Sequence, residues 1–208
     1  MTEARLITVE GIEGAGKSSA LATLSDWVVA RGATPVVTRE PGGTGLGEEL
    51  REVLLGHREA GMSGDAEVLL MFAARAEHLH TVIKPALQAG HWVICDRFTD
   101  ASLAYQGGGR GLGLERVRAL ADWLLSDFRP DLTLWLDLPV TTGLARAAGR
   151  STPDRFESER ERFFEAVRAA YAQLAREEPA RIVRVDASMA QERVAAAITT
   201  ILERRYGN

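Results

Sequence analysis

The sequence predicts an α/β fold in which a parallel β-sheet lies between two layers of helices. Longer segments with apolar residues at helical spacing alternate with short runs of apolar and β-branched residues. Such alternation is typical of a mostly parallel sheet, because each crossover between parallel strands needs a helix to bring the chain back. The 208 residues contain no internal repeat or linker, so we expect a single domain over residues 1–208. The predicted strands are residues 5–10, 34–38, 91–95, 132–138 and 181–186.

Each predicted element has a local reason. The first, third and fourth strand runs are almost continuously apolar, as expected of strands that helices cover on both faces. The first helix is closed by Gly32, since glycine readily adopts the conformation that ends a helix, and the second is interrupted near Pro85. The predicted helices are residues 19–32, 65–90, 162–178 and 190–205.

Composition narrows the function class. The hydrophobic fraction of 46% and the charged fraction of 26% are ordinary for a globular enzyme, and the formal charge of -4 disfavours general binding to nucleic acid. The single cysteine, Cys95, lies in the apolar run WVIC and is expected to be a buried thiol in a reducing compartment. The sequence has no signal peptide and no run of about 20 apolar residues. We therefore expect a cytoplasmic protein without a membrane partner.

The stretch GIEGAGKS (11–18) predicts a phosphate-binding loop of the P-loop type. It fits the pattern G-x-x-x-x-G-K-[S/T] and lies between an apolar strand and an amphipathic helix. Its glycines allow backbone N–H groups to point inward, and the helix N-terminus favours an anion. Lys17 is expected to reach the β- and γ-phosphates of a nucleotide, and Ser18 to bind Mg²⁺. The expected ATP-binding residues here are Gly11, Ile12, Glu13, Gly14, Ala15, Gly16, Lys17, Ser18 and Ser19.

A second motif indicates which P-loop chemistry applies. The apolar strand VICD ends in Asp96, a suitable carboxylate for the magnesium side, and Arg97 follows it directly. An Asp-Arg pair of this kind indicates transfer to a second substrate that itself carries a phosphate. A GTPase is disfavoured because the guanine-selecting Asn-Lys-x-Asp motif is absent; the only asparagine is Asn208.

Three further stretches closely resemble bacterial thymidylate kinases. They are TREPGGT (38–44), LLMFAARAEHL (69–79) and DRFTDASLAYQGGGRG (96–111), and the resemblance runs in order from about residue 5 to residue 187. It implies a P-loop nucleoside monophosphate kinase: a three-layer sandwich with a five-stranded parallel sheet and a short lid at about 146–157. It also implies that the γ-phosphoryl group of ATP, bound with Mg²⁺, is transferred to dTMP to give dTDP for dTTP synthesis, by a homodimer.

The resemblance assigns residues to the phosphate and sugar of dTMP. Arg97 would clamp the dTMP phosphate, since a guanidinium suits a phosphate dianion. Arg39 would reach toward the same phosphate, and Pro41 would fix the path of its loop. Tyr105 would pack beneath the sugar and disfavour a ribose 2′-hydroxyl, while Gln106 follows in the same motif without a defined role.

The resemblance also assigns the base contacts. Phe72 would stack on thymine and Arg75 would hydrogen-bond to its O4, because spacing of i, i+3 keeps both on one helix face. Several relatives have this pair at i, i+4, which nominates Met71 in place of Phe72. Ser102 would face the base. Ala101 stands where the family commonly has serine and offers no hydroxyl.

The segment RAAGRSTPDRFE (146–157) supplies three candidate lid arginines. Phosphoryl transfer needs a basic group that stabilises the transferring phosphoryl, and the family supplies it from the phosphate loop or from the lid. Gly14 occupies the loop position here, so the resemblance implies Arg150 as the first choice and Arg155 as the second. Arg146 is either part of this group or a solvated charge. The expected catalytic residues are Lys17, Asp96, Arg97 and Arg150, with Ser18 and Asp96 as metal ligands.

Two further side chains have two interpretations each, and one further loop has a single one. Glu13 either faces the acceptor's 3′-hydroxyl or a metal-bound water, or it braces the phosphate loop. Arg51 is a second phosphate contact or a solvated helix charge. The loop VDAS (185–188) matches the segment that lies near adenine in the family.

Three alternative functions can be compared with features of the sequence. The nearest is a P-loop kinase for another nucleotide or for a deoxynucleoside. A nucleotide-binding module without an acceptor is disfavoured by Arg97, Tyr105 and the lid arginines, and a nucleic-acid-binding ATPase by the acidic charge balance.

Overall fold

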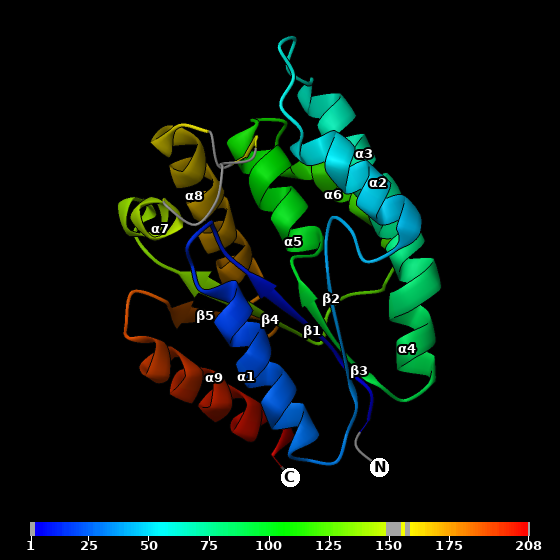
Figure 1. Ribbon diagram of the computed structural model, residues 1–208, viewed down its shortest axis with the longest axis vertical. Coiled ribbons are helices and arrows are strands. Elements are labelled where there is room, and N and C mark those ends of the chain that lie inside the picture. The colour runs from blue at the N-terminus through cyan, green and yellow to red at the C-terminus, as the bar shows by residue number, and fades with distance from the viewer. Residues whose placement is uncertain (1–2, 149–154, 157–158, 208) are drawn as a thin grey trace.

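A five-stranded parallel sheet forms the centre of the computed structural model, which describes residues 3–148, 155–156 and 159–207 (Figure 1). The strand order is β2-β3-β1-β4-β5, and every neighbouring pair is parallel. The predicted sheet is therefore confirmed. The strands are β1 (Leu6–Glu10), β2 (Pro35–Arg39), β3 (Trp92–Asp96), β4 (Leu132–Asp137) and β5 (Ile182–Asp186).

Helices cover both faces of this sheet. α1 and α9 pack together on one face, while α8, α5 and the π-helical segment η2 lie on the other, as Figure 1 shows. α2, α3 and α6 extend the second layer beyond the edge near β2. The bounds are α1 (Lys17–Val29), α2 (Gly45–Leu55), α3 (Gly64–His78), η1 (Leu79–Ile83), α4 (Lys84–Gln88), α5 (Thr99–Ser102), η2 (Leu103–Gly109), α6 (Leu114–Leu125), α7 (Val140–Ala147), α8 (Glu161–Glu177) and α9 (Gln191–Tyr206).

The long helical segment predicted for 65–90 is divided by a π-helical turn. α3 continues into η1 and then into α4, which has Pro85 in its first turn. Proline has no N–H to donate to a carbonyl in the preceding turn, and widening of that turn is a common response. Gly90 adopts a left-handed φ of 83° after α4, as predicted for the residue that closes this segment.

The three central strands carry the core. All five residues of β1 and all six of β4 are buried, whereas β2 and β5 at the sheet edges are partly exposed. Cys95 is a buried free thiol in β3. No helix within the described ranges is both long enough and apolar enough to cross a bilayer.

The loops that follow adjacent strands are tied together at the carboxyl edge of the sheet. The Arg97 N–H donates to Val9 O at 3.0 Å, and the Glu40 N–H donates to Asp96 O at 2.9 Å. On the other side of β1, the Ala187 N–H donates to Asp137 O at 2.8 Å. The residues expected to act chemically are thus brought to one edge, where ligands bind in open α/β sheets.

The phosphate loop packs directly against α7. Gly14 has a φ of 74°, and a Cβ built on it would lie 2.0 Å from Gly143 O. A Cβ on Gly143 would in turn lie 2.7 Å from Glu13 O and 3.0 Å from Ile12 Cδ1. Neither glycine leaves room for a side chain, so the path of the loop depends on this backbone-to-backbone contact.

We predict that Gly143→Ala lowers the free energy of unfolding by about 1–3 kcal/mol, because its methyl group would overpack the contact with the phosphate loop. Urea unfolding of the variant and the wild type measures this difference. Gly45→Ala is the matched control: a Cβ there meets nothing within 4 Å, and alanine suits a helix, so stability is unchanged or rises. Equal stability of Gly143→Ala and the wild type would contradict the prediction.

Candidate functional site

A cavity of about 260 Å³ opens at the carboxyl edge of the sheet, between the phosphate loop and helices α3, α5 and η2. Its wall combines residues that lie far apart in the sequence. The expected site residues that line it are Glu13, Gly14, Gly16, Lys17, Ser18, Pro41, Arg75, Asp96, Arg97, Ser102, Tyr105 and Gln106.

The phosphate loop forms one end of this cavity. Gly16 takes a left-handed φ of 86° before α1, and Lys17 is the first residue of that helix. The Lys17 Nζ donates to Gly11 O at 3.3 Å and to Ile12 O at 3.4 Å, so the ammonium lies across the loop. Burial lowers the pKa of Lys17, and the positive charge of Arg97 lowers it further. A bound polyphosphate would reverse this effect by stabilising the charged form.

Ser18 and Asp96 offer oxygen atoms for a magnesium ion beside the loop. Both line the cavity, and Asp96 Oδ1 is buried without a hydrogen-bond partner among the described residues. No group of three or more His, Cys, Asp or Glu converges within residues 3–148, 155–156 and 159–207. This donor set fits Mg²⁺, which commonly binds to one or two protein oxygens together with water and substrate phosphates.

Glu13, Arg97 and Tyr105 form a triangle in the middle of the cavity. The Arg97 Nη2 donates to Glu13 Oε1 at 2.7 Å, and the Tyr105 hydroxyl donates to Glu13 Oε2 at 2.8 Å. The Arg97 guanidinium also lies 4.7 Å from the centre of the Tyr105 ring. Burial raises the pKa of Tyr105, so its hydroxyl remains protonated and donates to the carboxylate.

Arg97 keeps one donor for a ligand. Its backbone φ of 67° is left-handed, which is uncommon for a residue with a side chain and marks a constrained position. Its Nη1 is buried without a partner among the described residues. One arm of the guanidinium is therefore fixed by Glu13, and the other is available to an anion in the cavity.

Arg75 forms the opposite end of the cavity, and its side chain is 2% exposed. Its Nε donates to Glu40 Oε2 at 2.7 Å, while its Nη2 donates to Phe98 O and to Ser102 Oγ, both at 3.0 Å. Its Nη1 has no partner among the described residues. Arg75 and Arg97 thus both line the cavity, and each has one buried guanidinium nitrogen, Nη1, without a hydrogen-bond partner among the described residues.

The structure places Met71, and not Phe72, on the cavity wall. Phe72 is buried in the hydrophobic core, where its ring lies 4.7 Å from the Arg75 guanidinium carbon. The expected stacking position of Phe72 is thus corrected in favour of the i, i+4 alternative. On α3, the residues one turn before Arg75 straddle the boundary between core and cavity, and Met71 is on the cavity side. Phe98, which sequence reasoning did not nominate, also borders the cavity, although the residue is fully buried in the core.

The two arginines after β2 differ from expectation. Arg39 donates twice to the Glu48 carboxylate at 2.9 Å, is half-exposed and does not line the cavity. Arg51 does line it, and its Nη1 donates to Pro41 O at 2.8 Å. Arg39 therefore does not contact the cavity, because its guanidinium is bound by Glu48 of α2, whereas Arg51 lines the cavity wall.

Of the two preferred lid arginines, only Arg155 lies within the described residues; Arg150 lies outside them. Arg155 is held on the acceptor side: its Nη1 lies 2.7 Å from Glu67 Oε2, and its Nε donates to Leu54 O at 2.9 Å. It therefore does not reach the phosphate loop as expected of an ATP-binding residue. Glu67 is fully buried and also accepts from Arg110 and from Gln106 Nε2.

A second cavity of about 260 Å³ lies behind the phosphate loop and shares Gly14 and Gly16 with the first. Its lining includes Arg146 and residues that follow β5. The Arg146 Nη1 donates to Ala187 O at 2.8 Å, so this guanidinium is fixed to the VDAS loop. Arg146 is exposed and also bound to this loop, so both interpretations of this residue stay open.

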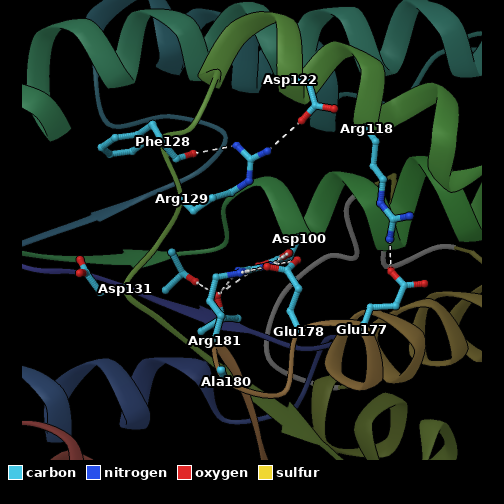
Figure 2. A network of polar contacts seen from close by, with 12 residues as sticks. Asp100, Arg118, Asp122, Phe128, Arg129, Asp131, Glu177, Glu178, Ala180 and Arg181 are labelled. Carbon is cyan, nitrogen blue, oxygen red and sulfur yellow. Dashed lines mark hydrogen bonds and ion pairs between the residues drawn. The ribbon is translucent and has the colours of Figure 1, made fainter.

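Sequence reasoning missed a buried carboxylate, Glu10, at the end of β1. Its Oε1 accepts the Phe98 N–H, and its Oε2 accepts the Tyr171 hydroxyl, both at 2.7 Å. Burial, together with the negative charge of Asp100, raises the pKa of Glu10 to about 8. Asp100 is itself bound by Arg181, which also binds Glu178 (Figure 2). An acid at the end of the mostly apolar strand LITVE was the signal that could have found Glu10.

Comparison with known proteins decides the family. The sequence model of thymidylate kinase matches residues 9–198. The chain belongs to the thymidylate kinase family. A thymidylate kinase of Alkalilimnicola ehrlichii is 59% identical over 203 residues, which cover 97% of this chain and 94% of that protein. A thymidylate kinase of Pseudomonas fluorescens is 54% identical over 196 residues, which cover 94% of this chain and 93% of that protein.

The fold agrees with a solved structure of the same family. The crystal structure of thymidylate kinase from Ehrlichia chaffeensis superposes with a TM-score of 0.80 at 29% identity and covers 96% of this chain and 98% of that chain. The expected family and the expected α/β fold are thus confirmed.

The pKa of Glu10 leads to a stability prediction for this thymidylate kinase. Between pH 4.5 and about 8 the folded state holds a proton on Glu10 that the unfolded state releases, so stability falls as pH rises through that window. Each unit of pKa difference corresponds to about 1.4 kcal/mol. In Glu10→Gln this contribution is absent, while an amide keeps a hydrogen bond to each of the two partners.

Urea unfolding at several pH values measures the effect. We expect Glu10→Gln to gain stability relative to the wild type as the pH rises from about 5 to about 8. Glu3→Gln is the control, because its side chain is 77% exposed and should leave the pH profile unchanged. Parallel profiles for the wild type and Glu10→Gln would show that Glu10 does not titrate in this window.

Proposed function

We propose that this chain, acting as a single kinase domain, transfers the γ-phosphoryl group of ATP to dTMP bound in the first cavity. Phosphorylation of dTMP to dTDP, which leads to dTTP, is the activity of the family to which the chain belongs. One observation carries the assignment of the acceptor site: a single cavity is lined by the phosphate loop and by two arginines, Arg75 and Arg97, whose Nη1 atoms have no hydrogen-bond partner among the described residues. Two such donors suit a nucleoside monophosphate, one for its anionic phosphate and one for a base carbonyl.

At the phosphate end, Lys17 binds the ATP phosphates and the free Nη1 of Arg97 binds the phosphate of dTMP. Ser18 and Asp96 hold Mg²⁺, which neutralises phosphate charge when bound. The half-buried position of Lys17 across the phosphate loop and the Asp96 Oδ1, which has no partner among the described residues, support these roles. Arg150 from the lid supplies the catalytic positive charge. Catalysis then consists of positioning and electrostatic stabilisation, with no covalent intermediate.

At the nucleoside end, the Arg75 Nη1 donates to the O4 of thymine, and Ser102 keeps this guanidinium in place. Met71 supplies an apolar wall for the base. Tyr105 packs against the sugar, with its hydroxyl held by Glu13, and disfavours a 2′-hydroxyl group. Glu13 braces Arg97 and Tyr105 and is positioned to accept from the acceptor's 3′-hydroxyl.

The second cavity is the site that we assign to adenine. It adjoins the phosphate loop on the side opposite the acceptor, and Arg146 with the VDAS loop forms its rim. ATP in this cavity and dTMP in the first would place their phosphates on either side of Gly14 and Gly16. We also propose that the enzyme works in the cytoplasm, where ATP is abundant and a free thiol such as Cys95 stays reduced.

We predict that Arg97→Ala lowers kcat/KM for dTMP by about 10²–10³-fold, because it removes a preorganised donor to the acceptor phosphate. ADP release in the presence of dTMP, dUMP, dCMP or AMP measures both the loss and the acceptor preference. ATP binding, followed by calorimetry, should be retained.

Arg129→Ala is the control, since this arginine pairs with Asp122 outside the cavity. Undiminished activity of Arg97→Ala would remove its assigned role. A clear preference for dUMP, dCMP or AMP over dTMP would instead favour a kinase for another nucleotide.

We propose a homodimer formed through the outer faces of α2, α3 and α6. These helices pack on one another and carry exposed apolar side chains: Val53 is 39% exposed, Leu69 56% and Trp123 81%. Large apolar side chains that gather on neighbouring helices commonly mark an interface.

If this face is the interface, Trp123→Asp and Leu69→Asp should yield monomers, because a charge buried in an apolar interface is not compensated. Sedimentation velocity compares each variant with the wild type. Val29→Asp, at a position on α1 that is 58% exposed, serves as the control and should remain dimeric. A dimer that survives both substitutions would place the interface elsewhere.

A further inference from the structure

A chain of polar contacts stands behind Arg75 at the base end of the cavity. The sequence prepares it: Thr38 and Glu40 are alternate residues at the end of β2, and Arg75 and His78 are one turn apart on α3. Glu40 Oε2 accepts from Arg75 Nε at 2.7 Å, and Glu40 Oε1 accepts from His78 Nδ1 at 2.9 Å. His78 Nε2 lies 2.7 Å from Thr38 Oγ1.

Both carboxylate oxygens of Glu40 are used, and both interactions are buried. Glu40 is 5% exposed, Arg75 2% and His78 0%. A carboxylate can only accept, so the proton on the His78 ring must be on Nδ1. In the neutral ring, Nε2 then accepts from the Thr38 hydroxyl. Glu40 thereby compensates the charge of Arg75 and is itself held in one orientation by His78.

The turn that follows β2 packs closely against His78 and Thr38. Gly43 has a φ of 79°, and a Cβ built on it would lie 2.8 Å from His78 Nε2 and 2.7 Å from Thr38 Oγ1. The loop therefore has no room to let the His78 ring rotate away. Neither Glu40 nor His78 received a role from the sequence, yet both are packed as tightly as core residues.

The hydrogen bonds of Arg75 fix the plane of its guanidinium from two sides. Glu40 holds Nε, whereas Phe98 O and Ser102 Oγ hold Nη2. Only Nη1 remains without a partner among the described residues, and Arg75 lines the cavity. A guanidinium has donors and no acceptor, so a fixed Nη1 favours a carbonyl oxygen and repels an amino group.

We propose that Glu40, braced by His78, is a positioning residue that keeps Arg75 Nη1 directed at the base edge and thereby selects a carbonyl over an amino group. The proposal rests on the proposed function, in which Arg75 contacts the base of the acceptor. Without Glu40 the side chain of Arg75 gains freedom to turn, and an amino group at the same place is no longer rejected. The inference thus concerns discrimination between dTMP and dCMP.

The test compares kcat and KM for dTMP, dCMP and ATP in the wild type, Glu40→Gln, His78→Leu and His78→Asn. We expect Glu40→Gln to raise KM for dTMP and to lower the kcat/KM ratio of dTMP to dCMP, each by about tenfold or more, as the loss of a hydrogen bond to a charged group implies. KM for ATP should not change, because Glu40 does not line the second cavity. A general loss of structure would not raise KM for dTMP while leaving KM for ATP unchanged.

His78→Leu should shift the same ratio in the same direction by a smaller factor. His78→Asn keeps an N–H near the position of Nδ1 and should restore the ratio toward the wild-type value. His80→Leu is the matched control, because His80 is exposed two residues further along the chain. If Glu40→Gln does not fold, the contrast between His78→Leu and His78→Asn decides the question on its own.

Arg75→Ala separates the inference from the proposed function. If this variant keeps the wild-type KM for dTMP, the assignment of Arg75 to the base is wrong. If Arg75→Ala loses affinity for dTMP while Glu40→Gln and His78→Leu retain the wild-type ratio, the positioning role of Glu40 is overturned. In the Arg75→Ala background, Glu40→Gln should cause no further loss of discrimination, because Glu40 is proposed to act only through Arg75.

Discussion

The first cavity depends on two arginines that are each partly paired with a carboxylate. An unpaired guanidinium in this setting would be costly to desolvate, and a fully paired one would have no donor left for a ligand. Glu13 binds one arm of Arg97, and Glu40 binds the Nε edge of Arg75. In both cases Nη1 has no hydrogen-bond partner among the residues that the structure describes. The two carboxylates come from different loops, so the charge balance of the cavity requires the β1 and β2 ends to stay adjacent to β3.

The close contact between Gly14 and Gly143 limits where a further positive charge for the transferring phosphoryl group can come from. A Cβ at Gly14 would lie 2.0 Å from a backbone oxygen, so an arginine at this loop position would not fit against α7. A basic group for the transferring phosphoryl must therefore enter from outside the loop. Arg146 is occupied by carbonyls beside the second cavity, and Arg155 is bound to Glu67. With Arg146 and Arg155 bound in this way, the remaining lid candidate is Arg150, which the family resemblance named first.

The sheet could be predicted from the sequence because buried parallel strands are continuous apolar runs. The phosphate loop could be predicted because its backbone geometry requires glycines at fixed spacing. The sequence was insufficient where a side chain's direction depends on a distant element. The turn of α3 that faces the cavity is set by packing against β2 and η2, so the choice between Met71 and Phe72 required the structure. Arg39 failed as a phosphate contact for a similar reason: Glu48, nine residues later, binds its guanidinium. Glu40 could not be found from its own motif because its partners are on α3.

Carboxylates at this edge of the sheet act by two different physical routes. Glu13 and Glu40 accept hydrogen bonds from arginines. Among the described residues Glu10 accepts from the Phe98 N–H and the Tyr171 hydroxyl, and burial with Asp100 nearby raises its pKa to about 8. Asp100 differs because Arg181 donates to both of its oxygens, at 2.6 and 2.9 Å, as Figure 2 shows. Arg181 thus fixes the position of Asp100, and the negative charge of Asp100 helps to raise the pKa of Glu10, whose Oε1 accepts the Phe98 N–H. Electrostatics outside the cavity therefore influence the group that holds the Arg97–Phe98 turn.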